Sequence, residues 1–223
     1  MMNEKKGTFV VLASGRGSNF QAILDQVNAG NIPASCCALI TDNPDAYAIE
    51  RAGAAGIPVQ VVAFRSFPDK GSYESALISA IDLYNPDLVV LAGYMRILGN
   101  AIVSRYAGRM INIHPSLLPA FPGLHAQEQA VRYGVKVAGC TVHFVTEDMD
   151  AGPVIIQRSV PVFAGDDGAL LAERILHEEH IAFPEAIRLF FTGRLYIEGR
   201  IVGICDPDAT PDLCGRHNGE ELR

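Results

Sequence analysis

Short apolar runs that alternate with helical patterns constrain the fold of this chain more than any other feature. The strand-like runs cover residues 8–13, 36–41, 59–64, 88–92 and 110–114, and the helical patterns cover residues 18–29, 46–55, 73–84 and 97–106. This alternation is typical of βαβ units, in which helices cover both faces of a parallel sheet. The run Leu88–Leu91 has no polar alternation, as expected of a central strand. We therefore predict a Rossmann-like α/β fold with an open, mainly parallel sheet.

The rhythm of the sequence changes after His125. Residues 138–145 and 154–162 have the pattern of strands, and the short acidic turn between them predicts an antiparallel C-terminal hairpin that extends the parallel core. A helical pattern then runs from residue 167 to 191, where Pro184 predicts a kink or a break. We expect a single domain over residues 1–204 and a poorly ordered tail over residues 205–223.

Composition argues against several classes of function. The 223 residues are 49% hydrophobic and carry a formal net charge of −7, which disfavours nonspecific nucleic-acid binding. The longest apolar stretch, residues 88–95, is too short to span a bilayer. The five cysteines show no C-x-x-C spacing, so we expect neither a zinc site nor a disulfide framework. These features predict a cytoplasmic protein with no nucleic-acid or membrane partner.

The strand Met110–His114 carries the most informative polar residues. Side chains alternate along a strand, so Asn112 and His114 point to the same face, and Pro115 ends regular pairing. The carboxyl end of a strand in an open α/β sheet is where ligands bind. An amide can hold an oxyanion, and an imidazole can move protons near neutral pH. For this pattern alone, a buried structural Asn/His pair is the alternative interpretation.

A glycine turn joins the first predicted strand to the first predicted helix. Gly15 and Gly17 permit backbone angles that other residues avoid, and Ser18 or Asn19 can cap the helix. Backbone N–H groups at a helix N-terminus bind anions, which predicts a phosphate site, although a simple tight turn fits the same pattern. Phe20 occupies the third glycine position of the dinucleotide fingerprint, so a dinucleotide oxidoreductase is disfavoured.

Several other polar residues permit two interpretations. By spacing alone, Asp150 is an ordinary acid of a surface turn. His177 and His180 are three residues apart rather than four, which favours a charged helix face over a metal site. Glu179 could bind sugar hydroxyls through both carboxylate oxygens. His143 alternates with apolar neighbours and is interpreted as a structural histidine.

Six motifs between residues 8 and 200 occur in an order and spacing that resemble one known family. They are VLASGRGSN (11–19), LAGYMRIL (91–98), INIHPSLLP (111–119), GCTVHFV (139–145), MDAGP (149–153), and EH at 179–180 followed by Pro184. Together they resemble the folate-dependent formyltransferase superfamily. The glycine turn and the 177–184 helix narrow the resemblance to the phosphoribosylglycinamide formyltransferases.

The resemblance implies a reaction and a set of site residues. Members transfer the formyl group of 10-formyltetrahydrofolate, a co-substrate, to the amine of glycinamide ribonucleotide in purine (IMP) biosynthesis, with no metal. The implied catalytic residues are Asn112, His114 and Asp150; the phosphate and ribose ligands are Gly17, Ser18, Asn19 and Glu179; and the folate contacts are Lys70, Met95, Arg96, Ile97 and Leu98. In these roles Asn112 and His114 would stabilise the negative oxygen of the tetrahedral adduct, and Asp150 would favour the protonated imidazole. The expected partners are small-molecule substrates, and the expected state is a monomer or homodimer.

Three other functions are weighed against this one. Methionyl-tRNA formyltransferase carries an additional RNA-binding domain and a basic surface, whereas fewer than 30 residues follow the core here and the charge is acidic. Formyltetrahydrofolate hydrolase has an N-terminal regulatory domain, for which the first seven residues leave no room. A non-catalytic phosphate- or folate-binding module would not need Asn112, His114 and Asp150 together.

Overall fold

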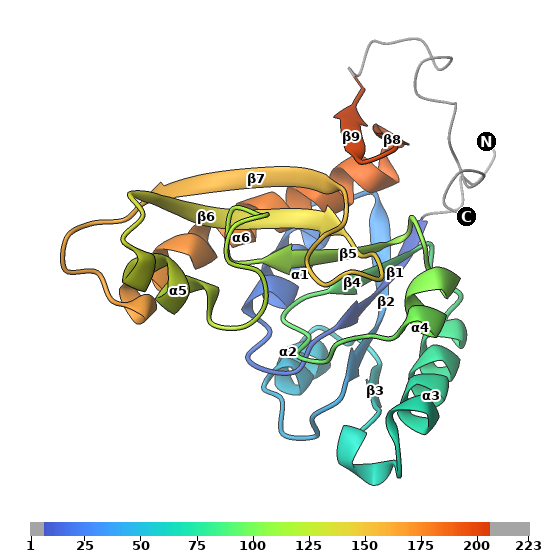
Figure 1. Cartoon of the computed structure of the whole chain (residues 1–223). Helices are drawn as coiled ribbons and strands as arrows, with labels where there is room; N and C mark the ends of the chain where they lie inside the picture. Colours follow the sequence, from blue (N-terminus) through green and yellow to red (C-terminus); the bar gives the residue numbers. More distant parts are fainter. Residues whose placement is uncertain (1–6, 206–223) are drawn as a thin grey trace. The chain divides into compact units, whose positions relative to one another are not determined.

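A computed structural model describes residues 7–205, in which strands and helices alternate along most of the chain (Figure 1). The chain divides into two compact units, Met1–Ile111 and Asn112–Arg223. The boundary falls inside strand β5 (Met110–His114), whose bounds are those predicted from the sequence.

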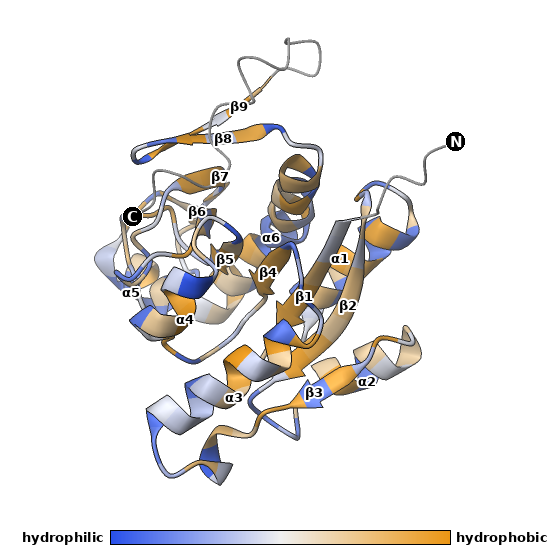
Figure 2. Cartoon of the chain, turned by 90° about the vertical axis from the view of Figure 1, so that its right-hand side faces the viewer, coloured by the Kyte–Doolittle hydropathy of each residue, from blue (hydrophilic) through white to orange (hydrophobic). Residues whose placement is uncertain are grey.

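The first unit is built on parallel strands. Its elements are β1 (Gly7–Leu12), α1 (Ser18–Asn28), β2 (Ala34–Thr41), α2 (Ala48–Ala54), β3 (Val59–Val61), α3 (Lys70–Asp82), β4 (Leu88–Leu91) and α4 (Asn100–Arg105). The strand order is β3-β2-β1-β4, and every one of these pairings is parallel. Strands β1 and β4 are among the most hydrophobic elements (Figure 2), and β4 is buried along its whole length. The predicted parallel, Rossmann-like core is therefore confirmed.

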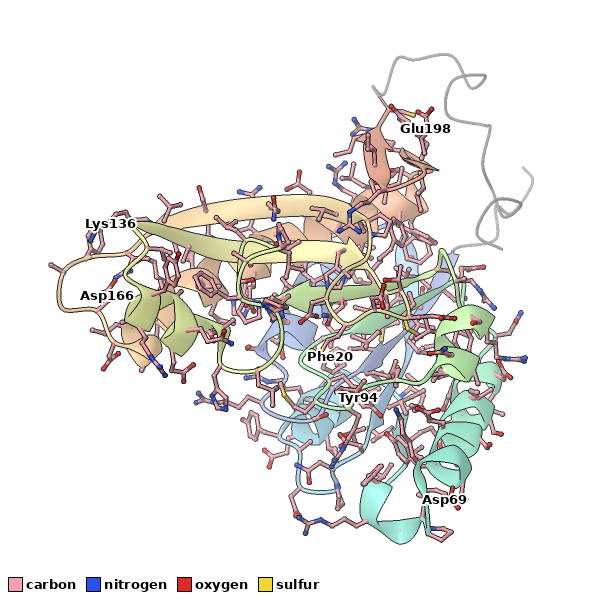
Figure 3. The ribbon with its side chains drawn as sticks, in the orientation of Figure 1. Phe20, Asp69, Tyr94, Lys136, Asp166 and Glu198 are labelled. Carbon is pink, nitrogen blue, oxygen red and sulfur yellow. The ribbon has the colours of Figure 1, made fainter. Side chains whose placement is uncertain are left out.

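Tertiary and capping contacts move three element boundaries in the first unit. Helix α3 begins before the predicted residue 73 because Asp69, at its N-terminal end (Figure 3), accepts a 2.7 Å hydrogen bond from the Ser72 N–H. The hydrogen bonds from Ser72 hold the pKa of Asp69 below its ordinary value. Helix α4 begins after the predicted residue 97, because Glu74 accepts from the N–H of its N-cap Gly99. The third predicted strand ends early, and Phe64–Ser66 form a 3-10 turn.

The second unit contains the predicted antiparallel hairpin. Its elements are α5 (Ala126–Tyr133), β6 (Val137–Phe144), β7 (Val154–Pro161), α6 (Gly168–Phe191), β8 (Leu195–Glu198) and β9 (Ile201–Ile204). Strands β6 and β7 pair antiparallel along their length, and the order continues β6-β7-β9-β8. Helix α6 packs against β6 and β7 (Figure 1). Helix α5 and strands β8 and β9 were not predicted.

Helix α6 is continuous through Pro184, so of the predicted kink or break the break does not occur. The apolar residues around this proline, including Phe183 and Ile187, are fully buried. Burial of this apolar face maintains the helix where proline removes a backbone hydrogen bond.

The cysteines and the helices bear on two further expectations. Cys36, Cys37 and Cys140 are free, whereas Cys205, for which the sequence carries no prediction, is disulfide-bonded. Within residues 7–205, no helix has the length and apolar character needed to cross a membrane. Residues 206–223 of the predicted tail lie outside the described residues.

Two glycines predict opposite effects of an added methyl group on stability. A Cβ at Gly139 in β6 would overlap the carbonyl oxygen of Arg158, whereas a Cβ at Gly53 in α2 would meet nothing within 4 Å. We expect Gly139→Ala to lower the free energy of unfolding by about 1–3 kcal/mol, because neither backbone can move cheaply. Gly53→Ala should raise it by roughly 0.5–1 kcal/mol through helix propensity. Urea denaturation followed by circular dichroism tests both, and an unchanged midpoint for Gly139→Ala would contradict the register of the hairpin.

Candidate active site

The second unit brings the three predicted catalytic side chains together. Asn112 and His114 lie on β5, and Asp150 lies in the turn between β6 and β7. The His114 Nδ1 atom is 3.3 Å from Asp150 Oδ2, and the two side chains are 6% and 11% exposed. The interpretation of Asp150 as an ordinary surface acid, drawn from spacing alone, was therefore wrong.

Both ring nitrogens of His114 face acceptors. Its Nε2 donates to the carbonyl oxygen of Phe121 at 2.9 Å, while Nδ1 faces the Asp150 carboxylate. Carbonyl and carboxylate oxygens only accept, so a ring protonated on both nitrogens satisfies both contacts. The site thus holds the imidazole between a backbone carbonyl and a carboxylate.

His143 fixes the amide of Asn112. Its Nδ1 donates to the carbonyl oxygen of Phe144 at 2.9 Å, and burial lowers the pKa of His143, so the ring is neutral and Nε2 is an acceptor. The Asn112 Nδ2 atom donates to the Nε2 atom of His143 at 3.3 Å. Asp150 Oδ1 lies 3.8 Å from the same Nε2 atom. The prediction that His143 is a structural histidine with its hydrogen bonds made is confirmed. Its contact with Asn112 was not predicted. The available signal was its place on a strand that follows the Asn/His strand.

Unusual backbone angles occur at the residues that contact His114. Asp150 and Phe121 both have a φ of 52°, in the left-handed region that residues other than glycine rarely adopt. The Asp150 Oδ2 atom also accepts the N–H of Gly123 at 2.8 Å, which fixes the turn to the following loop. A Cβ at Gly152 would overlap the carbonyl oxygen of Phe144, so the turn requires glycine there. Such conformations concentrate at functional sites.

The predicted phosphate loop lies in the first unit. Gly17 is the N-cap of α1 with a φ of 68°, and Ser18 is the first helical residue. The prediction that Ser18 or Asn19 caps the helix was therefore wrong. Because glycine has no side chain, the cap position supplies no acceptor for the first helical amides, which leaves the helix end suited to an anion.

Helix α2 fixes the shape of this loop. The Ala48 N–H donates to the Gly15 carbonyl at 3.1 Å, and Arg51 Nε donates to the Arg16 carbonyl at 2.9 Å. A Cβ at Gly17 would lie 2.8 Å from the Ala48 Cβ, so the close packing also requires glycine. Arg51 places a positive charge beside the loop, and nothing in the sequence had singled it out.

The predicted folate-binding segment adjoins the phosphate loop within the first unit. The Ser14 N–H donates to the Gly93 carbonyl at 3.1 Å, and the Met95 N–H donates to Ser14 Oγ at 2.9 Å. Met95 and Ile97 are 64% and 68% exposed, an unusual state for large apolar side chains next to a buried strand. The backbone is held while the side chains remain available for contact with a ligand.

Lys70 and Glu179, the remaining predicted binding residues, belong to different units. Lys70 Nζ lies 3.6 Å from Glu74 Oε1, the same atom that accepts from the Gly99 N–H at the end of the folate segment. Glu179 is buried on α6, and burial together with the charge of Glu179 raises the pKa of the Cys140 thiol to about 12. Among residues 7–205, no three His, Cys, Asp or Glu side chains form a group that could hold a metal ion.

Known proteins resemble this chain over most of its length. Phosphoribosylglycinamide formyltransferase of Escherichia coli (strain K12) is 48% identical over 186 residues, which are 83% of this chain and 88% of that protein. The enzyme of the same name from Bacillus subtilis (strain 168) is 46% identical over 180 residues, 81% of this chain and 92% of that protein. The crystal structure of glycinamide ribonucleotide transformylase 1 from Symbiobacterium toebii has a TM-score of 0.87 at 51% identity, covering 89% of this chain and 94% of that one.

The family assignment agrees with the Asn/His strand β5, the turn that carries Asp150 and the glycine loop at Gly17. Residues 8–187 match the model of the formyl transferase family, which is more than half of the chain. The chain therefore belongs to the formyl transferase family.

Proposed function

We propose that this protein transfers the formyl group of 10-formyltetrahydrofolate to the amine of N1-(5-phosphoribosyl)glycinamide, a step of purine (IMP) biosynthesis, and acts in the cytoplasm as a monomer or homodimer. The observation that carries the proposal is the contact of His114 with Asp150 beside the oriented amide of Asn112. The names of the relatives support the choice of glycinamide ribonucleotide as the acceptor.

The geometry of the second unit supports a defined chemical sequence. The substrate amine attacks the formyl carbon, a C–N bond forms, and the carbonyl oxygen becomes negative. The Asn112 amide would donate a hydrogen bond to that oxygen, and the positive charge of a protonated His114 ring would stabilise it electrostatically. The amine then loses a proton, the folate nitrogen gains one, and the bond between that nitrogen and the formyl carbon breaks. Asp150 would assist by holding the charged form of His114.

The first unit would supply binding. Gly17, Ser18 and Asn19 would hold the substrate phosphate at the start of α1, supported by the glycine cap and the nearby Arg51. Met95–Leu98 would contact the folate through exposed apolar side chains, with Lys70 attracting its negatively charged tail. Glu179 of the second unit would accept hydrogen bonds from the ribose hydroxyls.

The proposed reaction requires two substrates, and this requirement tests the function. A spectrophotometric assay of the purified protein should show folate turnover only when both glycinamide ribonucleotide and 10-formyltetrahydrofolate are present. Folate turnover without the amine would identify a formyltetrahydrofolate hydrolase. Formylation of methionyl-tRNA would identify a methionyl-tRNA formyltransferase. Binding of either ligand without any transfer would indicate a binding module.

Gly17→Ala tests the phosphate loop, with Gly15→Ala as its matched control. The added methyl group at Gly17 is strained by the positive φ and by Ala48, whereas a Cβ at Gly15 meets nothing within 4 Å. We expect the KM for glycinamide ribonucleotide to rise roughly tenfold to a hundredfold in Gly17→Ala, the effect of one charge-assisted hydrogen bond. The effect of Gly15→Ala should be smaller. Calorimetric titration with each substrate separates the sites, and equal weakening of both ligands would remove the phosphate assignment.

Asp150→Asn tests the catalytic pair. The substitution keeps the shape of the side chain but removes the charge that faces His114, so kcat should fall by roughly 10²–10⁴, the size of a general acid–base contribution. His114→Asn should be similarly damaging, and the double variant should be little worse than either single variant, because members of one proton-transfer unit are not additive.

The neighbouring turn acid provides the control for this experiment. Asp148→Asn changes a carboxylate of the same turn and should leave kcat within a few-fold of wild type, the usual effect of a surface substitution. Near-normal turnover in Asp150→Asn, or an equal loss in Asp148→Asn, would refute the proposed role of the pair.

A further inference from the structure

The segment Met95–Leu98 has exposed side chains on a firmly held backbone. Three side chains from separate parts of the first unit hold it: Ser14 after β1, Asp42 after β2 and Glu74 on α3. All three holding residues are buried, with exposed fractions of at most 9%. None was singled out from the sequence as a site residue.

Asp42 holds the side chain of Arg96. The Arg96 Nε atom lies 2.6 Å from Asp42 Oδ2, and the guanidinium stacks on the ring of Phe64 at 4.4 Å from its centroid. The Asp42 side chain is 2% exposed, and its Oδ1 atom makes no hydrogen bond with any residue in the described range 7–205. Arg96 therefore provides the direct neutralisation of this buried charge, which is costly to bury unpaired.

Glu74 holds the end of the segment, and Ser14 holds its start. Glu74 Oε1 accepts the N–H of Gly99 at 2.7 Å, and Ser14 Oγ accepts the N–H of Met95 at 2.9 Å. Immediately before the segment, the hydroxyl of Tyr94 (labelled in Figure 3) is hydrogen-bonded to that of Tyr73. The segment is thus fixed at both ends and at Arg96.

We propose that Ser14, Asp42 and Glu74 are positioning residues that hold Met95–Leu98 in the conformation that binds the folate. Buried acceptors that leave Met95 and Ile97 exposed reduce the conformational entropy that the segment loses when a ligand binds. The inference rests on the proposed function, because it takes the folate to be the ligand of this segment.

Asp42→Asn tests the inference through the two substrates separately. The substitution removes the charge that attracts Arg96, so the Kd for tetrahydrofolate and the KM for 10-formyltetrahydrofolate should both rise roughly tenfold. The KM for glycinamide ribonucleotide and kcat should stay near the wild-type values, a split that general destabilisation would not produce. Ser14→Ala, a smaller change that removes the acceptor of the Met95 N–H, should weaken folate binding in the same direction.

Asp82→Asn is the matched control. Asp82 pairs with Arg105 at the surface of the same unit, and within the described range 7–205 no hydrogen bond or ion pair joins it to the folate segment. It should leave the Kd for tetrahydrofolate unchanged. If Asp42→Asn binds tetrahydrofolate as tightly as wild type, or if Asp82→Asn weakens it equally, the positioning role is overturned.

Amide hydrogen exchange supplies a readout that needs no ligand. In both Asp42→Asn and Ser14→Ala, the amides of residues 94–99 should exchange faster than in wild type, while those of β4 keep their protection. Unchanged exchange would overturn the inference even if catalysis proceeds as proposed. Conversely, if wild type fails to bind tetrahydrofolate while the variants exchange faster at this segment, the proposed function fails and the positioning of the segment stands.

Discussion

The second unit depends most on the carboxylate of Asp150. One oxygen accepts the N–H of Gly123 and faces His114, while the other lies 3.8 Å from His143, which holds Asn112. A largely buried carboxylate is tolerated only where donors such as the Gly123 N–H and the His114 ring face it. The turn reaches this position through a left-handed backbone at Asp150 and a glycine at position 152. Removing this one charge would leave the His114 ring and the loop at Gly123 without the acceptor that they share.

The first unit uses the same principle to hold the segment that is proposed to bind the folate. Polar side chains that follow β1 and β2 hold the segment that follows β4. Ser14 accepts a hydrogen bond from the backbone of Met95, and Asp42 accepts one from the side chain of Arg96. In a dinucleotide-binding fold, an acid at the end of the second strand binds a ribose. Here Asp42 binds the side chain of Arg96 instead.

Local patterns predicted the fold where local rules dominate. Strand β5 was predicted with its observed bounds because period-two alternation meets a proline, and the β6–β7 hairpin followed from a short turn. The start of α4 was missed because Glu74, 25 residues earlier, fixes Gly99. Spacing alone also misjudged Asp150, since its contact with His114 is made through the fold. The family resemblance, which carries that tertiary information, assigned its role, whereas Arg51, Asp42 and the orientation of Asn112 by His143 required the structure.

The central claim is that Asn112 and a protonated His114, whose charge Asp150 favours, stabilise the negative oxygen of the tetrahedral adduct. The most direct measurement is the Ki of a stable tetrahedral analogue of that adduct, determined for wild type and for variants at these three positions. Differential stabilisation predicts that log Ki rises in proportion to the loss of log kcat/KM, with a slope near one, while the Kd values of the substrates change little. Variants that lose turnover yet bind the tetrahedral analogue as tightly as wild type would contradict the account.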